Sequence, residues 1–236
     1  MHSGVVKSEQ MYLQVMQAGE MEYLKCLQLQ QHLLCARQKD EIPDTLILVK
    51  HPPVITMGRN ANLSSIIAPS QQLKEMGIPV YETERGGDAA YHGPGQLVGY
   101  PVMSLKERGK NVHDYYSALE QVIIELLKRY DITAGRDHLY PGVWIGEKKI
   151  AAIGIAVKKW VTMHGFALNV FPDPWHTELI IPCGITGRSV TSLQELVSQE
   201  IDTQIISKEI IDIFSRIFAL NPIHRGAASF EAIGNG

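Results

Sequence analysis

The chain has 236 residues, of which 45% are apolar and 20% are charged, so it can bury a sizeable core and has the composition of a globular protein. Its 22 lysines and arginines against 25 acidic residues give a net charge of −3, which argues against the basic surface that nucleic-acid phosphates require. No apolar run reaches the roughly 18 residues of a membrane span, and the first ten residues lack the order of a signal peptide. We therefore expect a cytoplasmic protein that binds neither nucleic acid nor a membrane.

An early stretch of the chain has the spacing of a helix. In residues 21–39 the leucines and two cysteines, Cys26 and Cys35, fall mostly at helical intervals. The chain holds three cysteines, too few and too scattered for a disulfide framework or a structural zinc site. We therefore expect Cys26 and Cys35 to be small apolar residues on a buried helix face, in a reducing compartment.

Strands and a short helix are expected next. Residues 45–49 predict a buried strand, which Pro52 and Pro53 bring to an end. A short helix over 69–76 is followed by a second strand, which runs into a glycine-rich loop at residues 84–101.

The second half of the chain begins with its clearest helix. Asn111 is a good N-cap residue, and an apolar stripe continues from there to Tyr130. Two β-rich runs follow, and Gly146-Glu147 in the first of them is suited to a type II′ hairpin turn. A last helix is expected over 204–220, because Pro222 cannot continue it.

The order of these elements indicates the fold class. The middle third lacks the strand–helix alternation of a doubly wound fold, since strands there follow strands. No repeat, low-complexity tract or linker divides the chain. The sequence therefore predicts one α+β (α/β) domain over residues 1–236, with a mixed, mostly antiparallel sheet flanked by helices.

Glycines crowd residues 84–101, around Arg85, Tyr91 and His92. Because glycine has no side chain, such a loop can wrap a ligand's chain or present N–H groups to a carbonyl or phosphate. It matches neither a P-loop, which needs Lys-Ser/Thr after the glycines, nor a dinucleotide fingerprint in its strand-to-helix context. A surface turn with a structural histidine is the alternative.

Small residues also follow two titratable ones in the β-rich runs. They are Ala151, Ala152 and Gly154 after Lys149, and Gly165 and Ala167 after His164. Such strands can line a groove without filling it. Taken alone, however, a lysine at the start of a strand is more often a solvated side chain.

Cys183 lies in a loop between Pro182 and Gly184, directly after an apolar strand-like segment. Such a cysteine is a candidate nucleophile, although an inert structural role fits the composition equally well. A reactive thiolate needs its pKa lowered from about 8.5 by a nearby cation or helix N-terminus. The candidate cations, if the fold brings them close, are Lys148, Lys149, Arg85, His92 and His164.

Taken together, and in this order, several segments resemble the lipoyl(octanoyl) transferases of lipoate biosynthesis. The matching segments are His51-Pro52-Pro53-Val54, Thr56-x-Gly58-Arg59, Arg85-Gly86-Gly87-x-x-x-Tyr91-His92-Gly93-Pro94-Gly95-Gln96, Lys149-Ile150 with Gly154, His164-Gly165-x-Ala167-Leu168-Asn169, and Pro182-Cys183-Gly184 with Val190-Thr191-Ser192-Leu193. The resemblance covers roughly residues 10 to 220.

The resemblance implies a biotin/lipoate A/B protein ligase-like fold and an acyltransferase. Such an enzyme moves an octanoyl (or lipoyl) group from acyl carrier protein to a lysine on the lipoyl domains of 2-oxoacid dehydrogenases and the glycine cleavage H protein, the first step of endogenous lipoate biosynthesis. It implies no cofactor, no metal and a monomer.

The resemblance also implies roles for individual residues. Cys183 would form the acyl thioester, and Lys149 would be the cation that lowers the pKa of its thiol. The implied acyl-substrate pocket consists of Arg85, Gly86, Gly87, Asp88, Ala89, Ala90, Tyr91, His92, Ala152, Ile153, Gly154, Gly165, Phe166 and Ala167. The family usually has threonine where this chain has Ala90, so one hydroxyl of that pocket is missing.

Two other functions compete with this one. An ATP-dependent lipoate or biotin protein ligase of the same fold would adenylate a free acid and would not need Cys183. A non-catalytic acyl-binding module would use the glycine-rich loop as a clamp, without need of a cysteine and a lysine together. For an acidic carrier protein we expect a local basic patch formed by Lys148, Lys158, Lys159 and Arg188.

Overall fold

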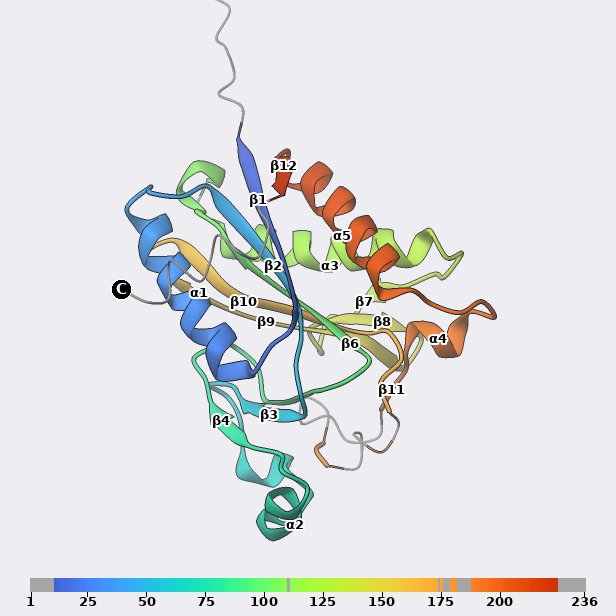
Figure 1. The fold of residues 1–236 in the computed structure, drawn as a ribbon. Helices are drawn as coiled ribbons and strands as arrows, with labels where there is room; N and C mark the ends of the chain where they lie inside the picture. The colour runs from blue at the N-terminus through green and yellow to red at the C-terminus, as the bar shows by residue number, and fades with distance from the viewer. Residues whose placement is uncertain (1–10, 110, 174, 176–178, 182–187, 225–236) are drawn as a thin grey trace, which may run out of the picture.

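The computed structural model describes residues 11–109, 111–173, 175, 179–181 and 188–224 (Figure 1). Cys183 lies outside the described residues. No helix within the described ranges is long and apolar enough to cross a membrane.

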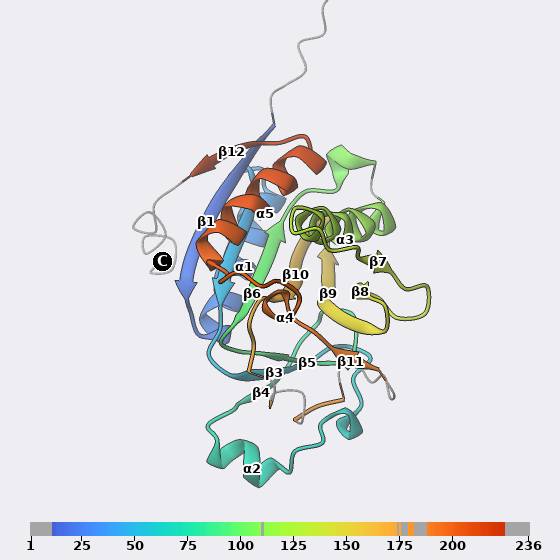
Figure 2. The ribbon, with the colours of Figure 1, turned by 90° about the vertical axis from the view of Figure 1, so that its right-hand side faces the viewer.

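The larger of two sheets has nine strands and runs through the centre of the fold (Figure 2). Its strands are β1 (Tyr12–Glu20), β2 (Asp44–Lys50), β6 (Gln96–Val102), β7 (Gly135–Arg136), β8 (Val143–Ile145), β9 (Lys148–Lys158), β10 (Val161–Asn169), β11 (Ser189–Val190) and β12 (Asn221–His224). They are ordered β12-β1-β2-β6-β10-β9-β8-β7, with β11 paired to β9. The pairs β12–β1, β1–β2 and β11–β9 are parallel and the others antiparallel. The expected mixed, mostly antiparallel sheet is therefore confirmed.

Helices cover both faces of this sheet (Figure 1). The helices are α1 (Tyr23–Gln38), α2 (Ser70–Glu75), α3 (Val112–Lys128), α4 (Leu193–Leu196) and α5 (Thr203–Ile217), with 3₁₀ turns η1 (Leu63–Ser65) and η2 (Lys106–Arg108). On β2, Leu46 and Leu48 pack in the core with α3 and α5, whereas Ile47 and Val49 pack in the core with α1. This alternation follows from the two-residue period of a strand and gives a sheet that is buried on both faces.

A second sheet has three strands, the last of which in chain order lies in the segment expected to be a loop. Its strands are β3 (Val54–Met57), β4 (Val80–Glu82) and β5 (Ala89–His92), in the order β4-β3-β5. The expectation of a loop throughout 84–101 was therefore wrong, because this range contains β5 and most of β6. Glycines are compatible with strand here because a neighbour occupies their side-chain space: a Cβ on Gly99 of β6 would lie 2.1 Å from the ring of Phe166.

Most expected helices form within a few residues of their predicted bounds. Asn111 caps α3, since its Oδ1 accepts hydrogen bonds from the backbone N–H groups of His113 and Asp114. The turn at Gly146-Glu147 joins β8 to β9, with a φ of 57° at Gly146. The last helix, α5, ends at Ile217, three residues before the expected end.

The interpretation of α1 as a helix with both cysteines buried was half wrong. Cys26 is buried but Cys35 is exposed. The buried face of α1 also carries two polar residues: Gln30, which accepts a hydrogen bond from the backbone N–H of His164, and Arg37. Cys35 follows Cys26 by nine residues, which at 3.6 residues per turn places it on the opposite side of the helix.

Arg37 belongs to a buried ionic cluster around Asp44, the first residue of β2. Asp44 accepts from Arg37 Nε at 2.8 Å, from Arg108 Nη2 at 3.2 Å and from the backbone N–H of Ser104 at 2.9 Å. Asp44→Ala would leave two partly or fully buried guanidinium groups without this carboxylate, so we expect it to lower the free energy of unfolding by about 3–5 kcal/mol. Urea unfolding measures this loss. Asp40→Asn, at an exposed partner of Arg37, is the matched control and should cost under about 1 kcal/mol.

Candidate active site

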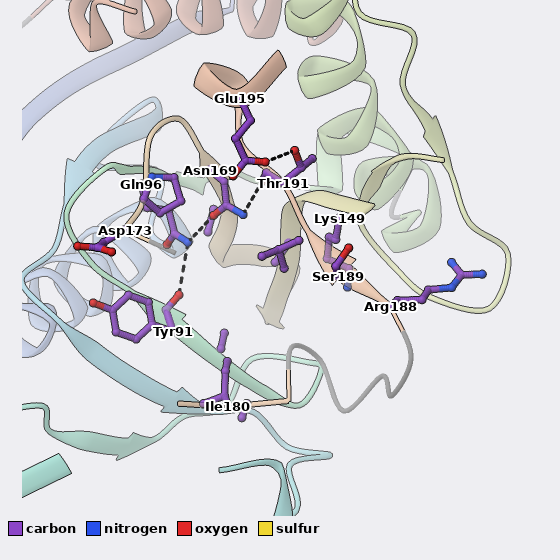
Figure 3. A pocket seen from close by; sticks show the side chains of 16 residues that line it. Tyr91, Gln96, Lys149, Asn169, Asp173, Ile180, Arg188, Ser189, Thr191 and Glu195 are labelled. Carbon is purple, nitrogen blue, oxygen red and sulfur yellow. Dashed lines mark hydrogen bonds between the residues drawn. The ribbon is translucent and has the colours of Figure 1, made fainter. Parts of the chain in front are cut away.

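Two adjoining cavities lie between the small sheet and strands β9 and β10 of the large one. Figure 3 shows the first cavity, of about 400 Å³, and the second has about 210 Å³. Both are lined by Ala89, Ala90, Ala152 and Ala167. These four methyl groups are therefore the shared wall where the two cavities meet.

The second cavity gathers most of the residues expected in an acyl pocket. Its lining includes Arg85, Gly87, Asp88, Ala89, Ala90, His92, Ala152, Ile153, Gly154, Gly165, Phe166 and Ala167. Of the remaining two, Tyr91 lines the first cavity, and Gly86 lines neither but donates its N–H to Ile155 O at 2.9 Å. Sequence reasoning gave no role to Tyr23, Val98, Tyr100 or residues 139–141, which together with His164 complete the lining. The structure thus brings the expected residues together, and their binding role stays a prediction.

Arg85 shapes the wall of this cavity through the backbone around it. It is buried, and its guanidinium donates to Thr56 Oγ1, to Thr56 O at 2.6 Å and to Asp88 O at 2.8 Å. These bonds fasten the loop before β5 to strand β3. The backbones of β10 and β6 also lie very close together, because a Cβ on Gly165 would lie 2.1 Å from the carbonyl oxygen of Gly99. Glycine at 165 is thus required by the approach of two backbones.

The two histidines of the second cavity are buried and neutral. His92 Nδ1 lies 2.8 Å from Gln96 Oε1, which is an acceptor because the same amide donates its N–H to Asn169. Desolvation, with a smaller contribution from His51, lowers the pKa of His92 to about 3. Desolvation, followed by the charge of Arg85, lowers the pKa of His164 to about 4. Neither imidazole therefore supplies a positive charge at neutral pH, and both drop out as cations that could activate a thiol.

These two pKa values predict a loss of stability in mild acid. Below about pH 6.5 the histidines of the unfolded chain bind protons, while His92 and His164 in the folded protein stay neutral until about pH 4. The unfolded state then binds more protons than the folded state. As the pH is lowered, the free energy of unfolding should therefore decrease by up to about 1.4 kcal/mol per pH unit for each histidine. Urea titrations between pH 7 and 4.5 measure this slope. His164→Asn, which tolerates the φ of 58° at this position, should reduce it by one histidine's share, and an unchanged slope would contradict the assignment.

Lys149 reaches the first cavity because strand β9 is irregular beside it. Val143 of β8 pairs with Ala151, but the next residue, Trp144, pairs with Lys149, so Ile150 is an extra residue in β9. Such a β-bulge reverses the alternation of side chains along a strand. In a regular strand Lys149 would share the core-facing side of Ala151. The bulge instead places it on the face of β9 that lines the cavities.

The surroundings of Lys149 are buried and largely fixed. Its side chain is 3% exposed, and its Nζ lies 4.8 Å from the centre of the Trp144 ring. Its backbone carbonyl accepts from the N–H of Thr191 at 3.0 Å. A Cβ on Gly142 would lie 3.5 Å from Lys149 Cε, so the aliphatic stem packs along this glycine. The expectation of a lysine on a solvated strand end is thus wrong for Lys149.

A chain of hydrogen bonds runs along the wall of the first cavity (Figure 3). Gln96 Nε2 donates to Asn169 Oδ1 at 3.0 Å, and Asn169 Nδ2 donates to Thr191 O at 3.1 Å. The hydroxyl of Thr191 in turn donates to Glu195 Oε2 at 2.8 Å. Gln96, Asn169 and Thr191 lie within the recognised motifs, but sequence reasoning gave them no role. Their role in the structure is to fix β6, β10 and β11 around Lys149.

The segment with Cys183 lies outside the described residues, but both of its flanks lie at the first cavity. Ile180 and Arg188 line that cavity together with Lys149, and Arg188 lies on the same side of it as Lys149 (Figure 3). Within the described parts of the chain, no group of three or more His, Cys, Asp or Glu side chains could hold a metal ion.

The four cations expected to form one basic patch do not lie together. Lys148 and Lys158 are the two ends of β9, whose 11 residues put them about 30 Å apart. Lys158 forms an ion pair with Glu84 at 2.6 Å, and Arg188 forms one with Asp137 at 2.5 Å. The proposed patch is therefore wrong, because a strand separates its members and acidic residues neutralise two of them.

Comparisons with known proteins agree on one family. The sequence profile of the lipoyl protein ligase A/B catalytic domain matches residues 22–215. An octanoyltransferase of Desulforamulus reducens is 46% identical over 90% of this chain and 93% of its own length, and one of Alkaliphilus metalliredigens is 48% identical over 88% and 96%.

Solved structures show the fold at much lower identity. The bi-partite lipoate protein ligase of Thermoplasma acidophilum superposes with a TM-score of 0.70 and 16% identity, over 95% of this chain and 90% of its own. The biotin protein ligase of Aquifex aeolicus reaches 0.54 at 14% identity, over 88% and 70%. The expected biotin/lipoate ligase-like fold is therefore confirmed. The chain belongs to the lipoyl protein ligase A/B catalytic family and, by its relatives at 46% and 48% identity, to the octanoyltransferases, which are acyltransferases of lipoate biosynthesis.

Proposed function

We propose that this enzyme takes its octanoyl (or lipoyl) group from acyl carrier protein and transfers it through a thioester on Cys183 to a lysine of a lipoyl domain. The acceptors would be the lipoyl domains of 2-oxoacid dehydrogenases and the glycine cleavage H protein. We further propose that residues 1–236 act as a single catalytic domain and as a cytoplasmic monomer.

The observation that carries the proposal is the position of Lys149. A buried lysine lies in a cavity that continues past four alanines into a second cavity lined by small and apolar side chains. In the sequence Cys183 follows Ile181 by two residues, and Ile180 lines the same cavity. A thiol beside this cation, at one end of an apolar pocket, would suit the chemistry of an acyl thioester.

The chemistry needs two exchanges at one carbonyl carbon. In the first, the Cys183 thiolate attacks the donor's carbonyl carbon, a new C–S bond forms as the donor's C–S bond breaks, and the carrier leaves as a thiolate that takes a proton from water. In the second, the neutral amine of the acceptor lysine attacks, a C–N bond forms as the C–S bond to Cys183 breaks, Cys183 leaves as a thiolate, and the amine's proton passes to water. A thioester is already activated, so neither exchange consumes ATP. The cation at Lys149 would keep the pKa of the Cys183 thiol below its usual range, which raises the thiolate fraction at neutral pH.

Intact-protein mass spectrometry tests this function directly. The enzyme is incubated with octanoyl-acyl carrier protein, without ATP, and an apo lipoyl domain is then added. We expect an octanoyl adduct that maps to Cys183, is released by hydroxylamine and moves to the acceptor lysine. Modification that requires free octanoate and ATP would instead identify a ligase. Binding of the acyl group without turnover would identify a non-catalytic module.

A further inference from the structure

Trp144 is the aromatic partner of Lys149 in strand β8. The two residues oppose each other in the β8–β9 pairing, and Lys149 Nζ lies 4.8 Å from the indole centre. Trp144 is 4% exposed, so the contact is shielded from water. A cation on a desolvated indole face is held about as strongly as a moderate hydrogen bond.

The indole itself is held at its edge and by a second cation. Its Nε1–H donates to Tyr140 O at 2.8 Å. The guanidinium carbon of Arg188 lies 4.9 Å from the Trp144 ring centre and 4.7 Å from that of Tyr140. Arg188 is in turn fixed by its ion pair with Asp137. Two cations on the same side of the first cavity, Lys149 and Arg188, are thus joined through one indole ring.

We propose that Trp144 is a positioning residue for acyl transfer, which holds the Lys149 ammonium at the first cavity, and that Arg188 fixes Trp144 in place. The inference rests on the proposed function of Lys149. Trp144 does not itself line either cavity, so it acts through Lys149 and not on the acyl group.

The physical reason lies in the flexibility of lysine. Its side chain has four rotatable bonds, each with several staggered positions, and the bulge at Ile150 places it at the wall of the first cavity. An aromatic face next to the ammonium favours the rotamers that keep Nζ over the ring. Holding a charged group in place before the reaction saves the entropy of ordering it during the reaction.

The test measures single-turnover acylation of Cys183 by octanoyl-acyl carrier protein, by mass spectrometry, in Trp144→Leu and Trp144→Phe. We expect about a 10- to 30-fold lower rate constant at pH 7 for Trp144→Leu, with a nearly unchanged KM for the donor, and only a two- to fivefold loss for Trp144→Phe. The pH profile of Cys183 alkylation by iodoacetamide should shift upward in Trp144→Leu. Trp160→Leu, at an exposed tryptophan on the β9–β10 turn, is the matched control and should leave the rate unchanged.

A double-mutant comparison separates positioning from folding. In a Lys149→Met background, both Trp144 substitutions should lower the acylation rate less than twofold, because the group they position is gone. Equal losses with and without Lys149 would overturn the proposal, as would an unshifted alkylation profile. If Trp144→Leu does not fold, Trp144→Phe carries the same comparison. Absence of any Cys183 adduct in the unmodified enzyme would refute the proposed function itself and is distinguishable from these outcomes.

Discussion

Replacing Cys183 by alanine is expected to abolish the acyl-enzyme and with it transfer to the lipoyl domain. The reason is chemical: none of the described side chains at the first cavity is a thiol, and an alanine cannot form a thioester. Mass spectrometry after incubation with octanoyl-acyl carrier protein measures the adduct, and gel shift of the lipoyl domain measures transfer. We expect both to fall below detection.

The exposed Cys35 offers a matched control for this experiment. It lies on the solvent side of α1, so Cys35→Ala should keep the full Cys183 adduct and remove any adventitious acylation of a surface thiol. An octanoyl adduct that persists when Cys183 and Cys35 are both replaced, together with normal transfer, would show that the nucleophile is another group.

Removing the charge of Lys149 is expected to have the second largest effect. Lys149→Met keeps an unbranched stem against Gly142 but places no cation beside the nucleophile. The pKa of the Cys183 thiol should then rise toward about 8.5, where only about 3% of it is thiolate at pH 7. We expect the rate of acyl-enzyme formation at pH 7 to fall by about 30-fold, in proportion to the loss of thiolate.

The sign of the pH dependence distinguishes activation from damage to the fold. A raised thiol pKa lowers the acylation rate most below pH 7, where little thiolate is present. The rate recovers as the pH passes about 8.5, so Lys149→Met should approach the unmodified enzyme in alkaline solution. Lys149→Arg keeps a cation and should retain more activity at pH 7 than Lys149→Met. A rate loss that is the same at pH 6.5 and pH 9 would mean that Lys149 does not act on the thiol.

The sequence predicted the fold best where pattern and packing agree. Helix α3 is capped by Asn111 and carries a continuous apolar stripe, and it forms as expected. Strand β6 was missed because Gly99 and Pro101 disfavour strands locally, although Gly99 is needed opposite the ring of Phe166. That requirement is set by a strand almost 70 residues away and has no local signal.

The candidate site was likewise predicted from the sequence only in part. Residues from three distant motifs do meet around the second cavity. Their side chains are small, which leaves room for a cavity between closely spaced strands. Trp144 could not be singled out, since its role comes from pairing with Lys149 across a hairpin and from Arg188 more than 40 residues later. The loss of charge from His92 and His164 likewise depends on burial, which sequence spacing does not report.

The bulge at Ile150 makes the site depend on strand register and not only on residue identity. A single residue inserted into β8 after Val143 would let β8 and β9 pair one to one. Lys149 would then turn toward the apolar residues beneath α3, and Ile150 would take its place at the cavity. An insertion in a neighbouring strand would thus remove the cation proposed for the active site, with every proposed site residue still present in the gene. A sequence alignment that does not consider strand pairing would find all of these residues present and would not detect the loss.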